Sequence, residues 1–166
     1  MPLARAGARV LAVERDPAWV ARVRESVGRA GLEDRVRILR ADLRTMRLPT
    51  EPYRVVANPP FGLTTTLFGR LLDDPRRGPW RADLLVQREV GRKRARTPPS
   101  DLRTAAWAPW WTFELGPSVP RNAFRPIPEV DATLLTIRRR DPAVLPAWLA
   151  PQLRELLRPG WVPPRR

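Results

Sequence analysis

Short apolar runs alternate along this chain with segments in which apolar residues recur at helical spacing. The runs predict strands over residues 9–14, 36–41, 53–57 and 83–87. Helices are predicted over residues 17–30, 64–72 and 88–95, with an amphipathic one near the end at about 145–157. An antiparallel pair is predicted from residues 110–115 and 133–138, which the proline-rich segment 116–128 joins. This alternation indicates an α/β fold with a mostly parallel sheet and an antiparallel hairpin at its edge.

The first predicted helix carries its own start and stop signals. Asp16 is a plausible N-cap, Pro17 fits the first helical position, and Gly31 ends the helix. The apolar stripe that we expect this helix to bury consists of Trp19, Val20, Val23 and Val27.

The third predicted strand ends in the turn Asn58-Pro59-Pro60-Phe61-Gly62. The two prolines stop the strand, because each lacks an N–H and has a fixed φ. The turn is therefore expected to be rigid, with Asn58 and Phe61 displayed at its tip. It also follows the carboxyl end of a strand, where open α/β sheets bind ligands.

This turn could hold the exocyclic amine of a purine. Such an amine is a poor nucleophile because its lone pair is delocalised into the ring, and its two N–H groups need two acceptors. The Asn58 side-chain oxygen and the Pro59 carbonyl oxygen could draw the nitrogen toward a pyramidal, more nucleophilic shape. Phe61 would stack on the base once the base has left its strand. The alternative is an ordinary Asn-Pro-Pro turn with an aromatic plug.

The charge of the chain favours a polyanionic partner. It has 31 Lys and Arg against 17 Asp and Glu, a formal net charge of +14, and nucleic acid is the commonest partner of such a field. Nearly all of the cations are arginines, whose forked guanidinium suits phosphates and base edges. A composition rich in Arg, Pro and Ala can also reflect a GC-rich genome.

Missing residue types exclude several kinds of site. The chain has no cysteine, which excludes disulfides and thiolate metal sites, and no histidine, the usual general base and commonest metal ligand. We therefore expect no metal. No stretch approaches the roughly 20 apolar residues of a membrane span, and the N-terminus lacks the long apolar region of a signal peptide. These features predict a cytoplasmic protein without a membrane partner.

Polar side chains close three successive predicted strands, at Glu14, Asp42 and Asn58. A carboxylate at the end of an early strand of such a sheet commonly accepts both hydroxyls of a ribose, which Glu14 could do. Asp42 could accept from an adenine amino group, or it could merely cap the next helix. Together with the Asn58 turn, these residues fit S-adenosylmethionine and N-methylation better than hydride transfer.

Longer motifs surround these residues. They are residues 12–16 (AVERD), 41–42 (AD), 56–62 (VANPPFG), 85–90 (LVQREV), 92–94 (RKR), 107–111 (WAPWW) and 124–131 (FRPIPEVD). Several amine and amide methyltransferases share the Asn-Pro-Pro-Phe element, whereas the Gln-Arg-Glu-Val stretch followed by Phe-x-Pro-x-Pro-x-Val-Asp is much more specific. Over about residues 11–146 the sequence resembles the ribosomal RNA adenine N6-methyltransferases. It is most similar to the macrolide–lincosamide–streptogramin B resistance enzymes of actinobacterial type.

The resemblance implies a class I, Rossmann-like fold and S-adenosylmethionine as cofactor. It also implies 23S rRNA as partner, with dimethylation of one adenine near the macrolide site and resistance to macrolide-type antibiotics. This chemistry suits a chain without histidine. A sulfonium carbon is already electrophilic, and the amine loses its proton readily once it is alkylated.

The resemblance also assigns roles by position. It makes Glu14 the ribose ligand, puts Arg15 beside the cofactor adenine, and puts Asp42 and the Leu43 backbone at that adenine's edge. Asn58 would border the cofactor and, with Pro59, grip the target N6. Phe61 would stack on the target base, and Phe124 would pack against its other side.

A group of cations follows the fourth predicted strand and is a candidate track for rRNA phosphates. It consists of Arg88, Arg92, Lys93, Arg94 and Arg96. The alternative is a solvated helix face whose arginine stems lie on apolar surface. The tryptophans at 107, 110 and 111 could stack on bases, but at strand spacing we expect two of them to fill the core.

The sequence departs from the family pattern at both ends. Family members have a central first strand ending in a Gly-x-Gly turn that receives the methionine end of the cofactor, and no Gly-x-Gly precedes Glu14. The C-terminal helical region is also shorter than the resemblance implies. We therefore expect a partial Rossmann-like domain over residues 1–140, lacking the first strand and glycine-rich loop, and a remnant of a helical rRNA-binding region over residues 141–166.

Such a chain would be a monomer with weak or no activity, and a fragment, a mis-called start codon or a decayed gene would each account for it. Two other functions stay open from the sequence. A DNA-adenine or glutamine-amide N-methyltransferase would use the same turn. A non-catalytic basic RNA-binding fragment would bind RNA in a salt-sensitive way that Asn58→Ala does not change.

Overall fold

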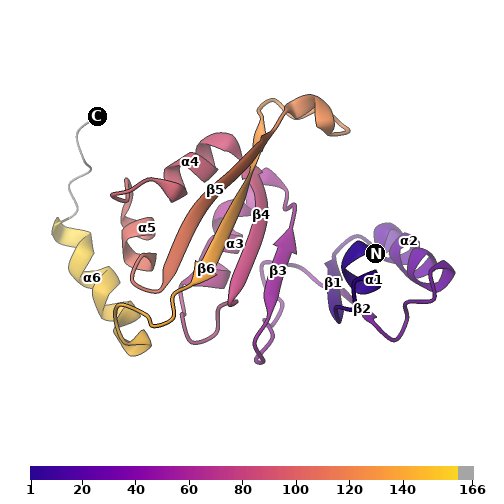
Figure 1. Cartoon of the computed structure of the whole chain (residues 1–166), viewed down its shortest axis with the longest axis horizontal. Coiled ribbons are helices and arrows are strands. Elements are labelled where there is room, and N and C mark those ends of the chain that lie inside the picture. Colours follow the sequence, from indigo (N-terminus) through magenta and orange to yellow (C-terminus); the bar gives the residue numbers. More distant parts are fainter. Residues whose placement is uncertain (161–166) are drawn as a thin grey trace. The chain divides into compact units, whose positions relative to one another are not determined.

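The structure is a computed structural model that describes residues 1–160, and the chain divides into two compact units (Figure 1). The first unit is Met1–Leu48 and the second begins at Pro49. The elements of the first unit are α1 (Pro2–Arg5), β1 (Val10–Glu14), α2 (Pro17–Arg29) and β2 (Val36–Arg40). Among the described residues, no helix is both long enough and apolar enough to cross a bilayer.

In the first unit β1 and β2 form a parallel pair, with Glu14 opposite Arg40. The start of α2 is as predicted, because Pro17 takes the first position and the Asp16 carboxylate accepts from the backbone N–H groups of the next turn. Ala4, Val27 and Val36 form the buried core of this unit.

The prediction that Trp19 shares the buried stripe of α2 was wrong. Val20 and Val27 are each 3% exposed, whereas Trp19 is 54% exposed. Successive residues point about 100° apart around a helix, so Trp19 lies beside the stripe rather than on it. Its ring instead lies under the Arg22 guanidinium, 4.9 Å from the ring centroid.

The second unit is built on a four-stranded sheet in the order β3-β4-β6-β5. Its strands are β3 (Arg54–Ala57), β4 (Arg81–Gln87), β5 (Trp111–Val119) and β6 (Ala132–Arg139). Its α-helices are α3 (Thr64–Leu72), α4 (Arg88–Ala95), α5 (Leu102–Trp107) and α6 (Ala150–Gly160), and short 3-10 turns are η1 (Phe61–Leu63), η2 (Arg121–Ala123) and η3 (Ala147–Leu149). The β3–β4 pair is parallel, and the β5–β6 hairpin joins β4 in antiparallel fashion. The predicted α/β fold with an antiparallel edge hairpin is thus confirmed.

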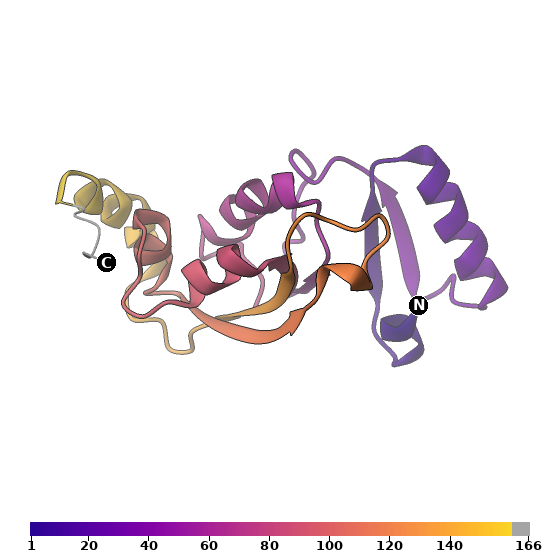
Figure 2. The same cartoon turned by 90° about the horizontal axis from the view of Figure 1, so that it is seen from above.

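The helices α3, α4 and α5 lie on one face of this sheet (Figure 2), and buried apolar side chains of the helices and strands form the core. Trp107, Trp110 and Trp111 are all at most 2% exposed, so the core takes all three tryptophans where two were expected. Each buried indole N–H finds an acceptor: the Asp73 carboxylate at 2.9 Å, the Leu145 carbonyl at 2.7 Å and the Leu72 carbonyl at 3.3 Å, respectively.

Several boundaries differ from the prediction. The helix α5 was not predicted, because six residues are too few to show a periodicity; its Asp101 N-cap accepts from the Thr104 N–H. The strand β5 continues past residue 115, with an irregularity between Leu115 and Ser118. The tail helix begins at Ala150 rather than near residue 145, after the turn η3.

The segment after residue 140 is part of the second unit, and α6 lies against α5. The guanidinium of Arg154 pairs with the Asp73 carboxylate at 2.8 Å. Residues 161–166, the last part of the predicted helical remnant at 141–166, lie outside the described residues.

Candidate functional site

The turn after β3 displays Asn58 as predicted. Pro59 is buried, whereas Asn58 and Pro60 on either side of it are exposed. The Pro60 carbonyl accepts from the Leu63 N–H at 2.8 Å, which starts the turn η1 and leads into α3. Within residues 1–160 neither the Asn58 side-chain oxygen nor the Pro59 carbonyl accepts a hydrogen bond, so both acceptors are available to a ligand.

A cleft of about 300 Å³ opens beside this turn, and its lining brings together residues 66 positions apart in sequence, from Asn58 to Phe124. Its lining residues are Asn58, Pro59, Pro60, Phe61, Phe124, Arg125, Pro126 and Pro128. Two polar acceptors and two aromatic rings therefore border one cleft. Such a set of groups suits a flat ring that carries an amino group.

Four of the five predicted cofactor ligands, Glu14, Arg15, Asp42 and Leu43, lie in the first unit, whereas Asn58 belongs to the second unit. Because β1 and β2 are parallel neighbours, Glu14 and Asp42 follow the strands at the same edge of the sheet, and the Ala41 N–H donates to the Glu14 carbonyl at 3.0 Å. The Glu14 Oε1 atom accepts from the N–H groups of the next two residues at 2.6 and 2.9 Å. These contacts orient the carboxylate, and Oε2 accepts no hydrogen bond within residues 1–160.

Asp42 is engaged within the chain. Its carboxylate accepts from the Arg44 guanidinium at 2.6 to 3.0 Å and from the Arg44 backbone N–H at 2.8 Å, and Arg15 lies 3.9 Å away. These contacts, chiefly the side-chain hydrogen bonds from Arg44, lower the pKa of Asp42 to about 2. The Asp42 carbonyl also accepts from the N–H groups of Thr45 and Met46. An adenine amino group could therefore bind Asp42 only if Arg44 gave up one of its contacts.

These residues fit an adenosine, with that one adjustment. Glu14 has a free carboxylate oxygen for a ribose hydroxyl, and the Leu43 N–H makes no hydrogen bond within residues 1–160. In the same described residues, no three Asp, Glu, His or Cys side chains gather as a metal site requires.

The predicted cation group divides in two. Arg92, Lys93 and Arg96 are exposed and Arg88 is half-buried, whereas Arg94 is 8% exposed. The Arg94 guanidinium pairs with the Asp101 carboxylate at 2.7 Å and lies near the rings of Phe68 and Trp107. The structure thus brings four of the five cations to the surface of one helix and its end.

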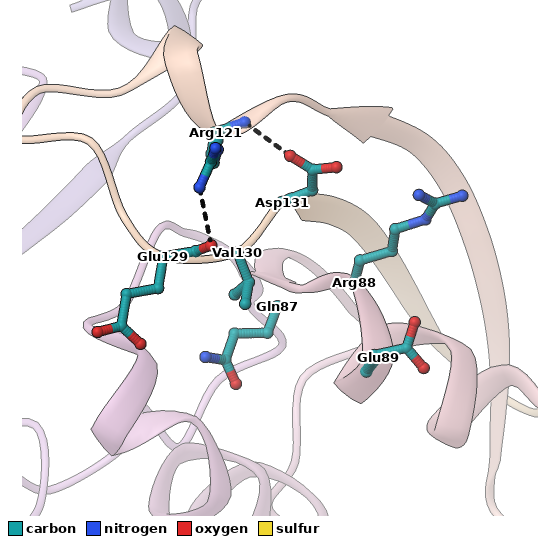
Figure 3. A pocket seen from close by; sticks show the side chains of 7 residues that line it. All are labelled: Gln87, Arg88, Glu89, Arg121, Glu129, Val130 and Asp131. Atoms are coloured by element: carbon teal, nitrogen blue, oxygen red, sulfur yellow. Dashed lines mark hydrogen bonds between the residues drawn. The ribbon is translucent and has the colours of Figure 1, made fainter.

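A second cavity, of about 450 Å³, lies where β4 meets α4 (Figure 3). Its lining residues are Gln87, Arg88, Glu89, Arg121, Glu129, Val130 and Asp131. Only Arg88 among them was predicted to have a role. The others lie in the Gln-Arg-Glu-Val and Phe-x-Pro-x-Pro-x-Val-Asp motifs or on η2. The sequence did not reveal that the two motifs are in contact, where the Arg88 N–H donates to the Asp131 carbonyl at 3.0 Å.

Comparison with known proteins identifies the family. Residues 2–159 match the family described as ribosomal RNA adenine dimethylase. An rRNA adenine N-6-methyltransferase of Corynebacterium diphtheriae is 42% identical over 145 residues, which are 86% of this chain and 54% of that protein. The mycinamicin-resistance protein MyrB of Micromonospora griseorubida is 35% identical over 157 residues, which are 95% of this chain and 48% of that protein.

The fold comparison agrees. The solved structure of the 23S rRNA methyltransferase ErmE superposes with a TM-score of 0.78 at 26% identity, covering 90% of this chain and 60% of that one. This chain spans about half the length of the curated relatives that it matches. Since the family match extends over residues 2–159, the chain belongs to the ribosomal RNA adenine dimethylase family.

Proposed function

We propose that this chain carries the target-base site and the cofactor-adenosine site of an S-adenosylmethionine-dependent rRNA adenine N6-methyltransferase. The observation that supports this most is the cleft that Asn58, Pro59, Phe61 and Phe124 share. Its two acceptors match the two N–H groups of an adenine N6, and its two rings match the two faces of the base.

The residues of each unit have separate tasks in this proposal. In the second unit, Asn58 and Pro59 hold the N6 protons, which directs the nitrogen lone pair away from the ring, and Phe61 and Phe124 hold the base flat. In the first unit, Glu14 binds the ribose of the cofactor, and Arg15, Asp42 and the Leu43 backbone border its adenine. The bound cofactor supplies an electrophilic methyl carbon.

Methyl transfer then needs no strong base. The N6 nitrogen forms a bond to the methyl carbon as the carbon–sulfur bond breaks, and the alkylated nitrogen releases its proton. Hydrogen bonds from N6 to the two oxygens tighten as the nitrogen gains positive charge, so they stabilise the transition state more than the bound base.

The exposed cations Arg92, Lys93 and Arg96, together with the half-buried Arg88, would hold the phosphates of the RNA around the target. Arg94 is left out of this role, because Asp101 and the neighbouring rings already engage its guanidinium. The finer expectations stay predictions: 23S rRNA as substrate, dimethylation, macrolide-type resistance, a monomeric state and a cytoplasmic location.

Radioactive methyl transfer tests the proposal. The chain, in excess over RNA, is incubated with methyl-labelled S-adenosylmethionine and 23S rRNA, and the product nucleoside is identified. We expect label in N6-methylated adenine, reduced about 100-fold or more by Asn58→Ala, by analogy with the loss of one oxyanion-hole donor, which costs about 10²–10³ in rate. Asn122→Ala, which alters an exposed asparagine outside the cleft, is the matched control and should leave the label unchanged.

The same assay separates the alternatives. Label in duplex DNA or in a glutamine-containing protein, with none in rRNA, would favour the other N-methyltransferases. RNA binding that survives Asn58→Ala, with no label in any substrate at protein excess, would contradict a catalytic role for this chain and favour a basic RNA-binding fragment.

A further inference from the structure

The second cavity lies next to the target-base cleft, and two structural links establish this within the second unit. The cleft follows β3 and the cavity follows β4, and these strands are paired, with Ala57 opposite Leu84. The connection between β5 and β6 contributes to the lining of both the cleft and the cavity. Pro128 lines the cleft, and the next residue, Glu129, lines the cavity. A single strand of RNA that places one base in the cleft therefore has a neighbouring nucleotide within reach of the cavity.

The charges around the cavity do not favour an anion. Its lining has two arginines against three carboxylates (Figure 3). The Asp131 carboxylate accepts from the Arg121 N–H at 2.9 Å, and the Arg121 guanidinium donates to the Glu129 carbonyl at 3.5 Å. A phosphate would meet these acids, whereas a neutral group with both donors and acceptors on its edge would find partners of both kinds.

A nucleobase is such a group. The Val130 side chain gives the cavity an apolar surface for the face of a ring, and 450 Å³ lies within the range of about 300–1,000 Å³ for small-ligand pockets. Proteins that recognise RNA sequence stack the face of an unstacked base on aromatic rings or arginine planes and hydrogen-bond its edge. This cavity offers two arginines and Val130 for the face.

Gln87 is placed to read that edge. Its side-chain amide offers both donors and an acceptor, and it makes no hydrogen bond within residues 1–160. Its backbone is fixed on both sides, because Gln87 pairs with Ala132 in the sheet and the next residue donates to the Asp131 carbonyl at 3.0 Å. A half-buried amide on a rigid backbone is well suited to discriminate between bases.

We propose that this cavity binds the base of a nucleotide adjacent to the target adenine, and that Gln87 reads its edge. The proposal rests on the proposed function, because it takes the cleft to hold the target base. It assigns to Gln87 a role in substrate specificity rather than in methyl transfer.

The test measures binding of the whole chain to labelled RNA hairpins by fluorescence anisotropy. The loop contains one adenine, and the target or either neighbouring base is replaced by an abasic site. We expect loss of one neighbouring base to weaken binding by the wild-type chain about tenfold. Gln87→Ala should weaken binding to intact RNA by a similar factor. The affinity of this variant should not fall further when that neighbouring base is removed.

Two further variants distinguish recognition of the base by Gln87 from a purely structural role of this residue. Gln87→Glu keeps the shape but removes the donors, so it should change which neighbouring base binds best. Gln152→Ala, which alters the exposed glutamine on α6, is the matched control and should behave like the wild type. Circular dichroism of each variant checks that the fold is kept.

The outcomes are distinct for the two proposals. If loss of the target adenine weakens binding but loss of neither neighbour does, the Gln87 assignment is wrong and the proposed function stands. A neighbour effect that persists unchanged in Gln87→Ala also overturns the assignment. If neither the target nor its neighbours affect binding, both proposals fail.

Discussion

The charged side chain of Arg94 is buried in the second unit. Its Nη1 atom lies 2.7 and 2.8 Å from the two Asp101 carboxylate oxygens and 2.8 Å from the Thr104 hydroxyl. The guanidinium carbon is 5.4 and 5.3 Å from the ring centroids of Phe68 and Trp107. Burial alone would raise the pKa of Asp101, but hydrogen bonds from Thr104 and the charge of Arg94 bring it below its usual value. The pair therefore remains charged and fixes the loop between α4 and α5.

Replacing Arg94 with methionine should destabilise the second unit by about 3 kcal/mol, because breaking a buried pair leaves its partner uncompensated. Urea unfolding monitored by tryptophan fluorescence measures this. The matched control is Arg92→Met on the same helix, whose pair with the exposed Glu89 should be worth less than about 1 kcal/mol. Equal effects of the two substitutions would contradict a structural role for Arg94.

Local sequence pointed to Asn58, Pro59 and Phe61, which line the cleft, but it could not separate Arg94 from its neighbours. The two prolines determine the turn that displays Asn58, and that is a short-range effect. Phe124 joined the site only through the family resemblance. Arg94 looks like Arg92 in sequence, and its burial depends on Asp101 and on rings from other elements. Those contacts arise only when the chain has folded.

The helix α4 lies close to the sheet because Gly91 has no side chain. A Cβ atom at Gly91 would lie 2.4 Å from the Thr133 Cγ2 atom and 3.1 Å from the Leu115 Cδ1 atom. Thr133 cannot easily move, since it is β-branched and its hydroxyl lies 3.1 Å from two carbonyl oxygens, those of Gly116 and Pro117. Gly91 thus sets the distance between the sheet and the helix that carries the exposed cations.

Gly91→Ala should destabilise the second unit by about 1–3 kcal/mol, the usual cost of overpacking a core. Thermal unfolding measures it. Gly28→Ala in α2 is the matched control: a Cβ atom there meets only the Glu33 Oε1 atom at 3.4 Å, and alanine is favoured over glycine in a helix by about 1 kcal/mol. A Gly91→Ala variant as stable as the wild type would contradict this packing.

Most elements could be predicted because each has its own apolar period and its own end signals. The strands β1 to β4 and the helices α2 to α4 agree with prediction to within about two residues. The exceptions depend on contacts distant in sequence. The extension of β5 follows from its pairing with β6, where Val119 lies opposite Ala132, and the exposure of Trp19 follows from which side of α2 meets the strands.

The whole molecule has an excess of cations, which the sequence shows, and a division into two compact units, which the sequence did not reveal. The net charge of +14 is evident from composition. The chain divides into compact units between Leu48 and Pro49, and the segment after residue 140 is part of the second unit. A compact unit is defined by contacts between residues that are distant in sequence. The local pattern of apolar and polar residues does not indicate these contacts.

Charge should make RNA binding strongly dependent on salt. For single-stranded RNA the logarithm of the binding constant falls with the logarithm of salt concentration by about 0.7 for each neutralised phosphate. If the α4 surface holds phosphates, the double substitution Arg92→Ala with Lys93→Ala should lower that slope by about 1.4, equally for all RNA sequences. Anisotropy titrations at several salt concentrations measure the slope.

The control substitutions distinguish a phosphate track from general attraction. Arg24→Ala with Arg29→Ala removes the same charge from α2, so it should change the slope little if binding is local to α4. Asn58→Ala should leave the slope unchanged, because an amide neutralises no phosphate. If both double variants lowered the slope equally, the positive field of the whole molecule would account for binding, and α4 would be a solvated surface with no special contact to RNA.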